Sequence, residues 1–297
     1  MTALETISKS SDSGRAQVTL KGTQETLLGT VSAKAADALS PNPILGDTWA
    51  AELLQTVNYN FSRLGVNGWL QAWPVLRSRS LDRWTSDFLD LHTHAPNGVT
   101  VLHLACGLDS RPLRLQRYFQ RMNLRWVDID LPDVVELRRQ VMPEPAIGFT
   151  KQSSYKLMSA SVTSKDWLDQ VPADRPTLII FEGLSMYLSA AEGRELIVRV
   201  VEHFQQGQLI FDVVNSFFVG SQRWVNPVAK SGSTLKWHVD RPIAVEAWAK
   251  GLQLRDEVLL SQRSEIKEFP WLVRLQFWIA ASLPWVQEFS RELRFAF

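Results

Sequence analysis

Four short segments of the sequence combine small residues with carboxylates or hydroxyls at places where buried strands are expected to end. They are residues 104–111 (LACGLDSR), 128–130 (DID), 159–162 (SASV) and 181–188 (FEGLSMYL). A loop of small residues lets the backbone approach a ligand, and acidic residues at strand ends can bind ribose hydroxyls. A buried carboxylate such as Glu182 needs a cationic or hydrogen-bonding partner. Each segment alone could be a tight turn or a helix cap, but the four together predict a site for a nucleoside-bearing cofactor.

The first loop indicates which class of cofactor this is. A dinucleotide-binding loop needs the pattern G-x-G-x-x-G to admit a pyrophosphate, whereas this loop has Ala105, Gly107 and Ser110 at the three positions. The lysine of a phosphate-binding loop is missing as well. A ligand that carries adenosine without phosphates fits better, and S-adenosylmethionine is the common one.

Three of these motifs, in this order, resemble those of one protein family. Residues 104–111 are similar to the pattern LGAGLDTR, residues 126–132 (WVDIDLP) to YxEVDLP, and residues 181–188 to AEGLLMYL. The pattern is that of the leucine carboxyl methyltransferase-like family of class I S-adenosylmethionine-dependent methyltransferases, in its polyketide O-methyltransferase branch. The resemblance covers about residues 20–297.

The resemblance implies which residues hold the methionine part of the cofactor. Arg77 matches the arginine that pairs with the methionine carboxylate, an anion that suits the guanidinium fork. Lys34 matches a second contact to that carboxylate. Gly107 belongs to the loop under the methionine part, and Glu182 lies on the side of its amine.

The resemblance also implies the residues at the nucleoside end, and here the sequence departs from the family. Asp130, with Asp128 nearby, matches the ribose contact, and Ser161 with Val162 follows the third strand. The family has an adenine-contacting aspartate where Ser161 stands, and its first loop glycine is Ala105. Serine still offers a weaker hydrogen bond and alanine adds only a methyl group, so we expect cofactor binding to survive.

The chemistry of a sulfonium methyl group limits what the protein must supply. The methyl is already activated, so proximity and orientation of the acceptor provide most of the rate. A carboxylate acceptor is ionised at pH 7 and needs no base, whereas a phenol, with a pKa of about 10, would be helped by one. His238 is the candidate base, because its segment is expected to cover the site. The resemblance implies O-methylation, and the choice between the two acceptors stays open.

The elements that must position these residues alternate between strands and helices. Strands are predicted at 99–104, 124–128, 156–162, 177–182 and 208–213, with helices at 132–141, 165–170 and 190–204. Near-continuous apolar strands that alternate with helices predict an α/β fold, a Rossmann-like, doubly wound and mostly parallel sheet covered on both faces. Two last strands, at 252–260 and 292–297, predict an antiparallel C-terminal edge.

The domain organisation follows from the same pattern. The polar residues 1–16 are expected to be a disordered tail, and residues 17–297 a single domain. This domain would consist of N-terminal helices (17–95, with a break at Pro74), the cofactor-binding core (96–215), a helical lid (216–250) and the sheet edge (251–297).

Composition restricts the class of protein. The chain has 297 residues, a net charge of +1, 45% hydrophobic residues and 21% charged residues, which is typical of a soluble globular protein. The charge balance argues against a nucleic-acid binder and against a polybasic membrane anchor.

The single cysteine, Cys106, excludes an internal disulfide and a cysteine-rich metal site, and it is a possible nucleophile without an identified base. We expect a cytoplasmic protein with a small-molecule acceptor and no metal, of open oligomeric state.

Two residue types are distributed unevenly. The sequence has 12 tryptophans against 4 tyrosines, and half of the tryptophans fall in its last quarter, beyond the cofactor motifs. This distribution favours an apolar, aromatic-walled acceptor pocket. Arginines recur at helical spacing at positions 111, 114, 117, 121 and 125, and we interpret them as a solvated helix face in preference to a phosphate-binding ridge.

Two other functional classes remain in view. The departures at Ala105 and Ser161 leave room for a catalytically degenerate methyltransferase-fold binding protein, which would hold the cofactor or a partner without turnover. A nicotinamide oxidoreductase is the weaker alternative, because the dinucleotide fingerprint is incomplete.

Overall fold

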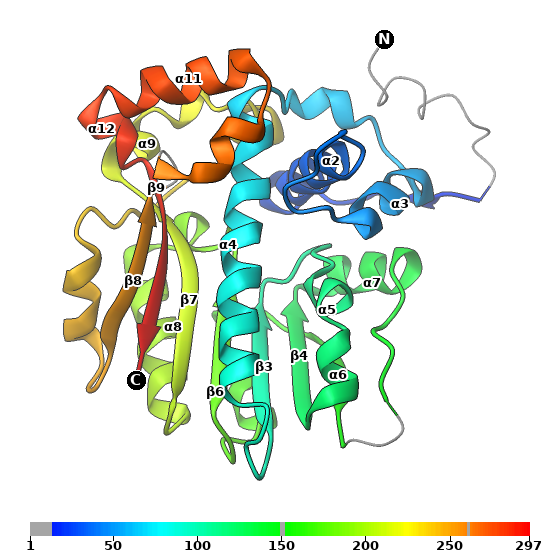
Figure 1. Cartoon of the computed structure of the whole chain (residues 1–297), viewed down its shortest axis with the longest axis vertical. Helices are drawn as coiled ribbons and strands as arrows, with labels where there is room; N and C mark the ends of the chain where they lie inside the picture. Colours follow the sequence, from blue (N-terminus) through cyan, green and yellow to red (C-terminus); the bar gives the residue numbers. More distant parts are fainter. Residues whose placement is uncertain (1–13, 149–151, 260–261) are drawn as a thin grey trace.

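The computed structural model describes residues 14–148, 152–259 and 262–297 of the chain (Figure 1). Its strands are β1 (Ala16–Gln17), β2 (Val57–Asn58), β3 (Val99–Leu104), β4 (Leu124–Asp130), β5 (Ser154–Ser159), β6 (Thr177–Phe181), β7 (Gly207–Val214), β8 (Gln253–Leu259) and β9 (Ser290–Ala296). Its helices are α2 (Thr26–Ala38), α3 (Thr48–Thr56), α4 (Trp69–Leu91), α5 (Arg111–Arg114), α6 (Arg117–Arg121), α7 (Pro132–Val141), α8 (Ala190–His203), α9 (Ser216–Gly220), α10 (Asn226–Ser231), α11 (Trp271–Ala281) and α12 (Pro284–Gln287). Short 3₁₀ turns are η1 (Gly22–Glu25), η2 (Phe61–Leu64), η3 (Leu168–Gln170), η4 (Ser185–Tyr187), η5 (Gln222–Trp224), η6 (Pro242–Trp248) and η8 (Ser264–Glu268).

Seven strands form one sheet in the order β5-β4-β3-β6-β7-β9-β8. The first five are parallel to one another, and β9 runs antiparallel to both β7 and β8. The predicted Rossmann-like sheet with an antiparallel C-terminal edge is thereby confirmed. The direction of winding reverses between β3 and β6, where Leu104 pairs with Phe181 in register. The loops that follow these two strands therefore begin side by side, at the point where such sheets bind ligands.

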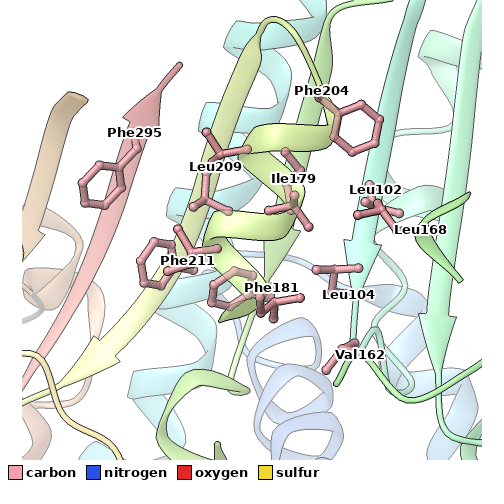
Figure 2. Close-up of a cluster of buried hydrophobic side chains, with 14 of the residues drawn as sticks. Leu102, Leu104, Val162, Leu168, Ile179, Phe181, Phe204, Leu209, Phe211 and Phe295 are labelled. Atoms are coloured by element: carbon pink, nitrogen blue, oxygen red, sulfur yellow. The ribbon is translucent and has the colours of Figure 1, made fainter. Parts of the chain in front are cut away.

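Helices cover both faces of the sheet. Leu81, Trp84 and Phe88 of α4 pack in one buried cluster with side chains from β3, β4, β6 and β7, and Figure 1 shows α4 crossing the sheet on this side. Ile197 and Val200 of α8 belong to the larger cluster on the opposite face. Successive strand residues point to opposite faces, so these apolar strands contribute side chains to both clusters. Figure 2 shows the larger cluster, including Leu102, Leu104, Ile179, Phe181, Leu209, Phe211 and Phe295.

Several predicted boundaries differ from the structure. The break expected at Pro74 is wrong, because α4 runs from Trp69 to Leu91 with Pro74 inside it. Proline there costs one helical hydrogen bond near the start of the helix, and the buried stripe of α4 that packs on the sheet offsets this loss. The third strand ends at Ser159 rather than at residue 162, and the predicted helix at 165–170 is only the 3₁₀ turn η3.

The N-terminal and lid segments also differ from expectation. Of the predicted tail, residues 1–13 lie outside the described residues, and Ala16–Gln17 forms β1, which pairs with β2. The segment 216–250 holds only short helices, and its Trp237, Val239 and Val245 belong to the larger core cluster.

Among the residues that the structure describes, no helix is both long and apolar enough to span a membrane.

The contact between α8 and the 216–250 segment is built around a glycine. A capping box begins α8: Ser189 Oγ accepts the Glu192 N–H at 3.2 Å, and the Glu192 carboxylate accepts the Ser189 N–H at 2.7 Å. The next residue, Gly193, lies under the indole of Trp237, which would be 2.2 Å from a Cβ placed there. An indole ring in a packed core has little room to move away.

We predict that Gly193→Ala destabilises the protein by about 1–3 kcal/mol, because the added methyl overpacks the core against Trp237. Urea unfolding followed by circular dichroism measures this change. Gly220→Ala is the matched control, because a Cβ at Gly220 of α9 meets nothing within 4 Å. Equal stability of the two variants would contradict the proposed packing.

Candidate functional site

A cavity of about 320 Å³ lies at the carboxyl ends of the central strands. Eight of the ten site residues named from the sequence line it, and they come from α2, α4 and the loops after β3, β4, β5 and β6. These residues are Lys34, Arg77, Ala105, Gly107, Asp130, Ser161, Val162 and Glu182. Asp128 and His238 do not line the cavity. The sheet therefore brings together residues that are up to 148 positions apart in the chain (34 to 182).

The loop after β3 is tied to the end of β4. Gly107 donates its N–H to one oxygen of Asp130 at 2.6 Å, and Leu131 donates to the other oxygen at 2.7 Å. Burial raises the pKa of Asp130, although these two N–H groups oppose the shift. Ala105 has φ +49, and among the described residues it is the only non-glycine with positive φ. The next helix, α5, begins only at Arg111 and is a single turn, so the loop itself lines the cavity.

The turn after β5 supplies Ser161 and Val162. Ser161 Oγ lies 2.8 Å from Thr163 Oγ1, and the Val162 carbonyl accepts a hydrogen bond of 2.6 Å from Arg199 of α8. The Trp167 indole donates to the same carbonyl at 3.3 Å. The side chains of Arg199 and Trp167 thus fix this turn through its Val162 carbonyl. Ser161 lies at the cavity wall.

A cluster of buried charges centred on Glu182 forms the polar wall of the cavity. The Glu182 carboxylate lies 3.2 Å from Arg77 Nε and 3.6 Å from Lys34 Nζ, and Arg111 Nη2 donates to it at 2.5 Å. Ser78 Oγ donates a further hydrogen bond at 2.7 Å. Burial opposes the ionisation of Glu182, but its three cations hold the pKa well below the usual range. Lys34 and Arg77, which the resemblance assigns to one ligand group, share this carboxylate.

Arg111 and Arg114 are buried in a second layer of ion pairs behind this wall. Their Nε atoms donate to opposite oxygens of Asp82, each at 2.7 Å. Arg114 also contacts Asp47 at 2.7 Å and Asp109 at 2.9 Å. The predicted solvated helix face is therefore wrong for these two arginines. The helix is interrupted between α5 and α6, so the five regularly spaced arginines do not form one ridge.

Asp212 is a supporting residue that the sequence analysis does not name. It is fully buried on β7, and it accepts hydrogen bonds from Arg77 Nη1 at 2.8 Å and from the Gly183 N–H at 2.6 Å. Burial raises the pKa of Asp212, against the opposing effects of Arg77 and Gly183. One carboxylate thus fixes both the guanidinium and the turn that follows Glu182. A lone acidic residue in the apolar strand GQLIFDVV is the signal that could have identified it.

Asp128 supports the site from outside the cavity. It is fully buried and accepts hydrogen bonds from Trp126 at 2.6 Å and from Arg138 and Tyr155 at 2.8 Å. Burial opposes its ionisation, but Arg138 and the hydrogen-bond donors hold the pKa of Asp128 below its usual value. Arg138 in turn donates to the carbonyls of Gly107 and Asp109 at 3.0 and 2.8 Å. Asp128 therefore acts on the loop through Arg138, whereas a direct ribose contact was expected.

The other end of the cavity is apolar. Phe218, Val225, Val228 and Leu235, all from the expected lid, line it together with Leu27, Val66, Leu70, Trp73 and Tyr187. Among the tryptophans whose side chains the structure describes, only Trp73 lines the cavity. Four of the others are buried in the core (Trp84, Trp126, Trp167 and Trp237), whereas Trp224, Trp271 and Trp278 are 79, 67 and 68% exposed. The wall is apolar as expected, but the excess of tryptophan does not explain it.

The structure does not favour a catalytic role for His238 or for Cys106. The imidazole of His238 is 44% exposed and lies 3.1 Å from Asp240, outside the cavity lining. Cys106 lines the cavity, but burial raises the pKa of its thiol well above the usual value. A protonated thiol is a poor nucleophile, so an apolar packing role suits Cys106 better.

A pH-dependent stability follows from Glu292, the register partner of Asp212 on β9. Burial raises the pKa of Glu292 to about 7, although Arg263 opposes the shift. The unfolded chain releases this proton near a pKa of about 4.3. Between these values the folded state binds more protons, so the free energy of unfolding falls as pH rises, by about 4 kcal/mol at most.

We therefore predict that Glu292→Gln removes most of this loss of stability. Urea unfolding of both proteins between about pH 5 and pH 8 measures the difference. The wild type should lose stability relative to the variant over this window. Parallel profiles would show that Glu292 does not carry the effect.

Comparisons with known proteins identify relatives over almost the whole chain. The leucine carboxyl methyltransferase family model matches residues 27–201. The tetracenomycin polyketide synthesis O-methyltransferase TcmP of Streptomyces glaucescens is 36% identical over 286 residues, covering 94% of this chain and 98% of the relative. The S-adenosyl-L-methionine-dependent methyltransferase dpfgK of Gibberella zeae is 35% identical over 274 residues, covering 87 and 89%.

A solved structure supports the fold. A DUF574 family protein from Streptomyces avermitilis superposes with a TM-score of 0.52 at 11% identity, covering 89% of this chain and 96% of that protein. The family match does not fit the nicotinamide oxidoreductase considered from the sequence. The chain belongs to the leucine carboxyl methyltransferase family and is an S-adenosylmethionine-dependent methyltransferase.

Proposed function

We propose that this methyltransferase transfers a methyl group from S-adenosylmethionine to a carboxylate or phenol oxygen of a small apolar or aromatic, polyketide-like metabolite. The observation that carries the proposal is the composition of one cavity, which joins the charged wall around Glu182 to an apolar wall from α2, α4 and the 216–250 segment. The relative TcmP is named as a polyketide synthesis O-methyltransferase, which supports oxygen as the acceptor atom.

The lining residues fit the proposed cofactor. The charged wall of the cavity is lined by two cations, Lys34 and Arg77, and by two carboxylates, Asp109 and Glu182. The zwitterionic methionine end of S-adenosylmethionine would find both donors and acceptors there.

Each lining residue then has a defined part in binding. Arg77 and Lys34 would hold the methionine carboxylate and Glu182 the amine, as charge complementarity requires. Asp130 would accept hydrogen bonds from the ribose, since carboxylate oxygens have further lone pairs after one N–H contact each. Ser161 would contact the adenine.

The acceptor side needs little chemistry from the protein. Bound S-adenosylmethionine supplies an activated methyl group, and the apolar wall excludes water and orients the acceptor oxygen. Burial raises the pKa of the lining residues Tyr187 and Cys106, so both keep their protons at neutral pH. Neither can take a proton from the acceptor. An oxygen that is already ionised in solution, as in a carboxylate, would need no base from the cavity.

We predict that Arg77→Ala and Glu182→Ala each weaken binding of S-adenosylhomocysteine by more than tenfold, as measured by isothermal titration calorimetry. Each change removes one member of a buried ion-pair cluster that faces the ligand, and a lost charge-assisted contact costs roughly 1.5–3 kcal/mol. His238→Ala is the matched control and should bind like the wild type, because His238 lies outside the cavity.

Circular dichroism must show that the Arg77 and Glu182 variants are folded, because loss of one charge leaves its partners unpaired. Wild-type affinity in both folded variants would refute the assigned site. Failure of the wild type to bind S-adenosylhomocysteine would refute the cofactor.

A second prediction concerns turnover. With a panel of aromatic carboxylic acids and phenols, we expect carboxylic acids to be methylated at a rate that changes less than about threefold between pH 6 and pH 8, because their acceptor oxygen stays ionised. Phenols should react faster as pH rises. Cofactor binding without turnover of any acceptor would instead support the catalytically degenerate binding protein.

A further inference from the structure

A second hollow, of about 540 Å³, shares no lining residue with the cofactor cavity. It lies between the start of α3, the middle of α4 and the two short helices α5 and α6. Its lining is Leu45, Gly46, Thr48, Trp49, Arg79, Asp82, Arg83, Ser86, Leu113, Arg114, Leu115 and Arg117. We call it the arginine groove, because four arginines and one aspartate make up its charged groups.

The negative charge of Asp82, the single aspartate of the groove, is already balanced by ion pairs with Arg111 and Arg114. Asp82 accepts hydrogen bonds of 2.7 Å from Arg111, and of 2.7 and 2.9 Å from Arg114. Asp47 accepts another from Arg114 at 2.7 Å. The carboxylates next to the groove are therefore engaged by the two buried arginines, and they leave the exposed ones uncompensated.

Three exposed arginines carry that surplus charge. Arg79, Arg83 and Arg117 are exposed, and none has a carboxylate partner within the described residues. Arg79, Arg83 and Ser86 lie on one face of α4, at i, i+4 and i+7. Arg117 Nη2 reaches this face, 3.5 Å from Ser86 Oγ. Like charges four residues apart on a helix repel, so an anion between the guanidinium groups would relieve the repulsion.

The hydrogen-bonding groups of the groove are almost all donors. Guanidinium and indole groups donate and cannot accept. The indole N–H of Trp49, a partly exposed residue, has no partner among the described residues, and the Thr48 hydroxyl adds one more donor. A ligand that fits this set offers several acceptor atoms and carries more than one negative charge.

We propose that the arginine groove binds a phosphate dianion, either free or as the phosphate group of a small ester. A phosphate dianion offers several acceptor oxygens to arginine forks and balances more of the three cations than a carboxylate does. The flat, partly exposed ring of Trp49 adds an aromatic surface next to the phosphate position. The source of the phosphate, free inorganic phosphate or a phosphate ester, is a question for the experiment.

The test is calorimetric titration of the protein, with its cofactor cavity saturated by S-adenosylhomocysteine, in buffer of about 20 mM ionic strength, where screening is weak. Inorganic phosphate and phenyl phosphate are the two probes. We expect saturable binding of both to the wild type. The variant R79Q/R83Q/R117Q should bind at least tenfold more weakly, and its affinity for S-adenosylhomocysteine should be unchanged.

The matched control is R139Q/R241Q/R255Q, which removes the same charge from three exposed arginines away from the groove. It should bind both probes like the wild type. Tighter binding of phenyl phosphate than of phosphate would identify a phosphate ester as the ligand class, and equal binding would identify phosphate itself. Absence of saturable binding to the wild type, or equal weakening in both triple variants, would overturn the proposal.

Discussion

The mutual neutralisation of buried charges around Glu182 is the interaction on which the rest of the site depends. One carboxylate at the end of β6 is contacted by Lys34 of α2, Arg77 of α4 and Arg111 of α5. Desolvating such groups costs several kcal/mol per ion, so the cluster is tolerable only when every member is present and correctly placed. The N-terminal helices are therefore fixed to the strand ends by electrostatics as well as by apolar packing. The same ion pairs therefore fix the positions of α2 and α4, which line the cavity.

The cavity has a charged wall and an apolar wall, which are suited to different ligands. Its charged wall joins Glu182, at the end of a parallel strand, to Lys34 of α2 and Arg77 of α4. Its apolar wall adds side chains of the 216–250 segment to others from α2 and α4. A methyl donor needs defined polar contacts, whereas an apolar acceptor needs shape and exclusion of water. Helices α2 and α4 contribute to both walls, so they join the two ends of the cavity.

The sequence predicted the parts of the fold that local chemistry determines. The strand Val99–Leu104 and the helix Pro132–Val141 fall at the predicted residues, because continuous apolar residues and a proline at the first helical position are strong local signals. The carboxyl ends of neighbouring parallel strands also follow from topology, which is why six of the eight named residues that line the cavity share it. The other two, Lys34 and Arg77, lie on helices and were assigned from the family resemblance.

Features that depend on distant partners could not be predicted in this way. Helical spacing of arginines says nothing about which carboxylates will face them, so the burial of Arg111 and the ion pairs of Arg114 were missed. The same holds for Asp212, whose role depends on a guanidinium 135 positions away in the chain. His238 was assigned from its segment alone, yet its side chain turns to Asp240 at the surface. Tryptophan counts likewise do not separate core from cavity or from surface.

The left-handed conformation of Ala105 has a consequence for the dynamics of the cofactor loop. A non-glycine residue in this region stores about 1–2 kcal/mol of strain, and the strain is released whenever the loop opens locally. The amides of Cys106 and Asp109, which bond to Ile129 and Cys106 within the folded loop, should therefore exchange with solvent about 5- to 30-fold faster than in an unstrained loop. Strain at Ala105 thus favours local opening of this loop, and contacts of a bound ligand with the loop would slow that opening.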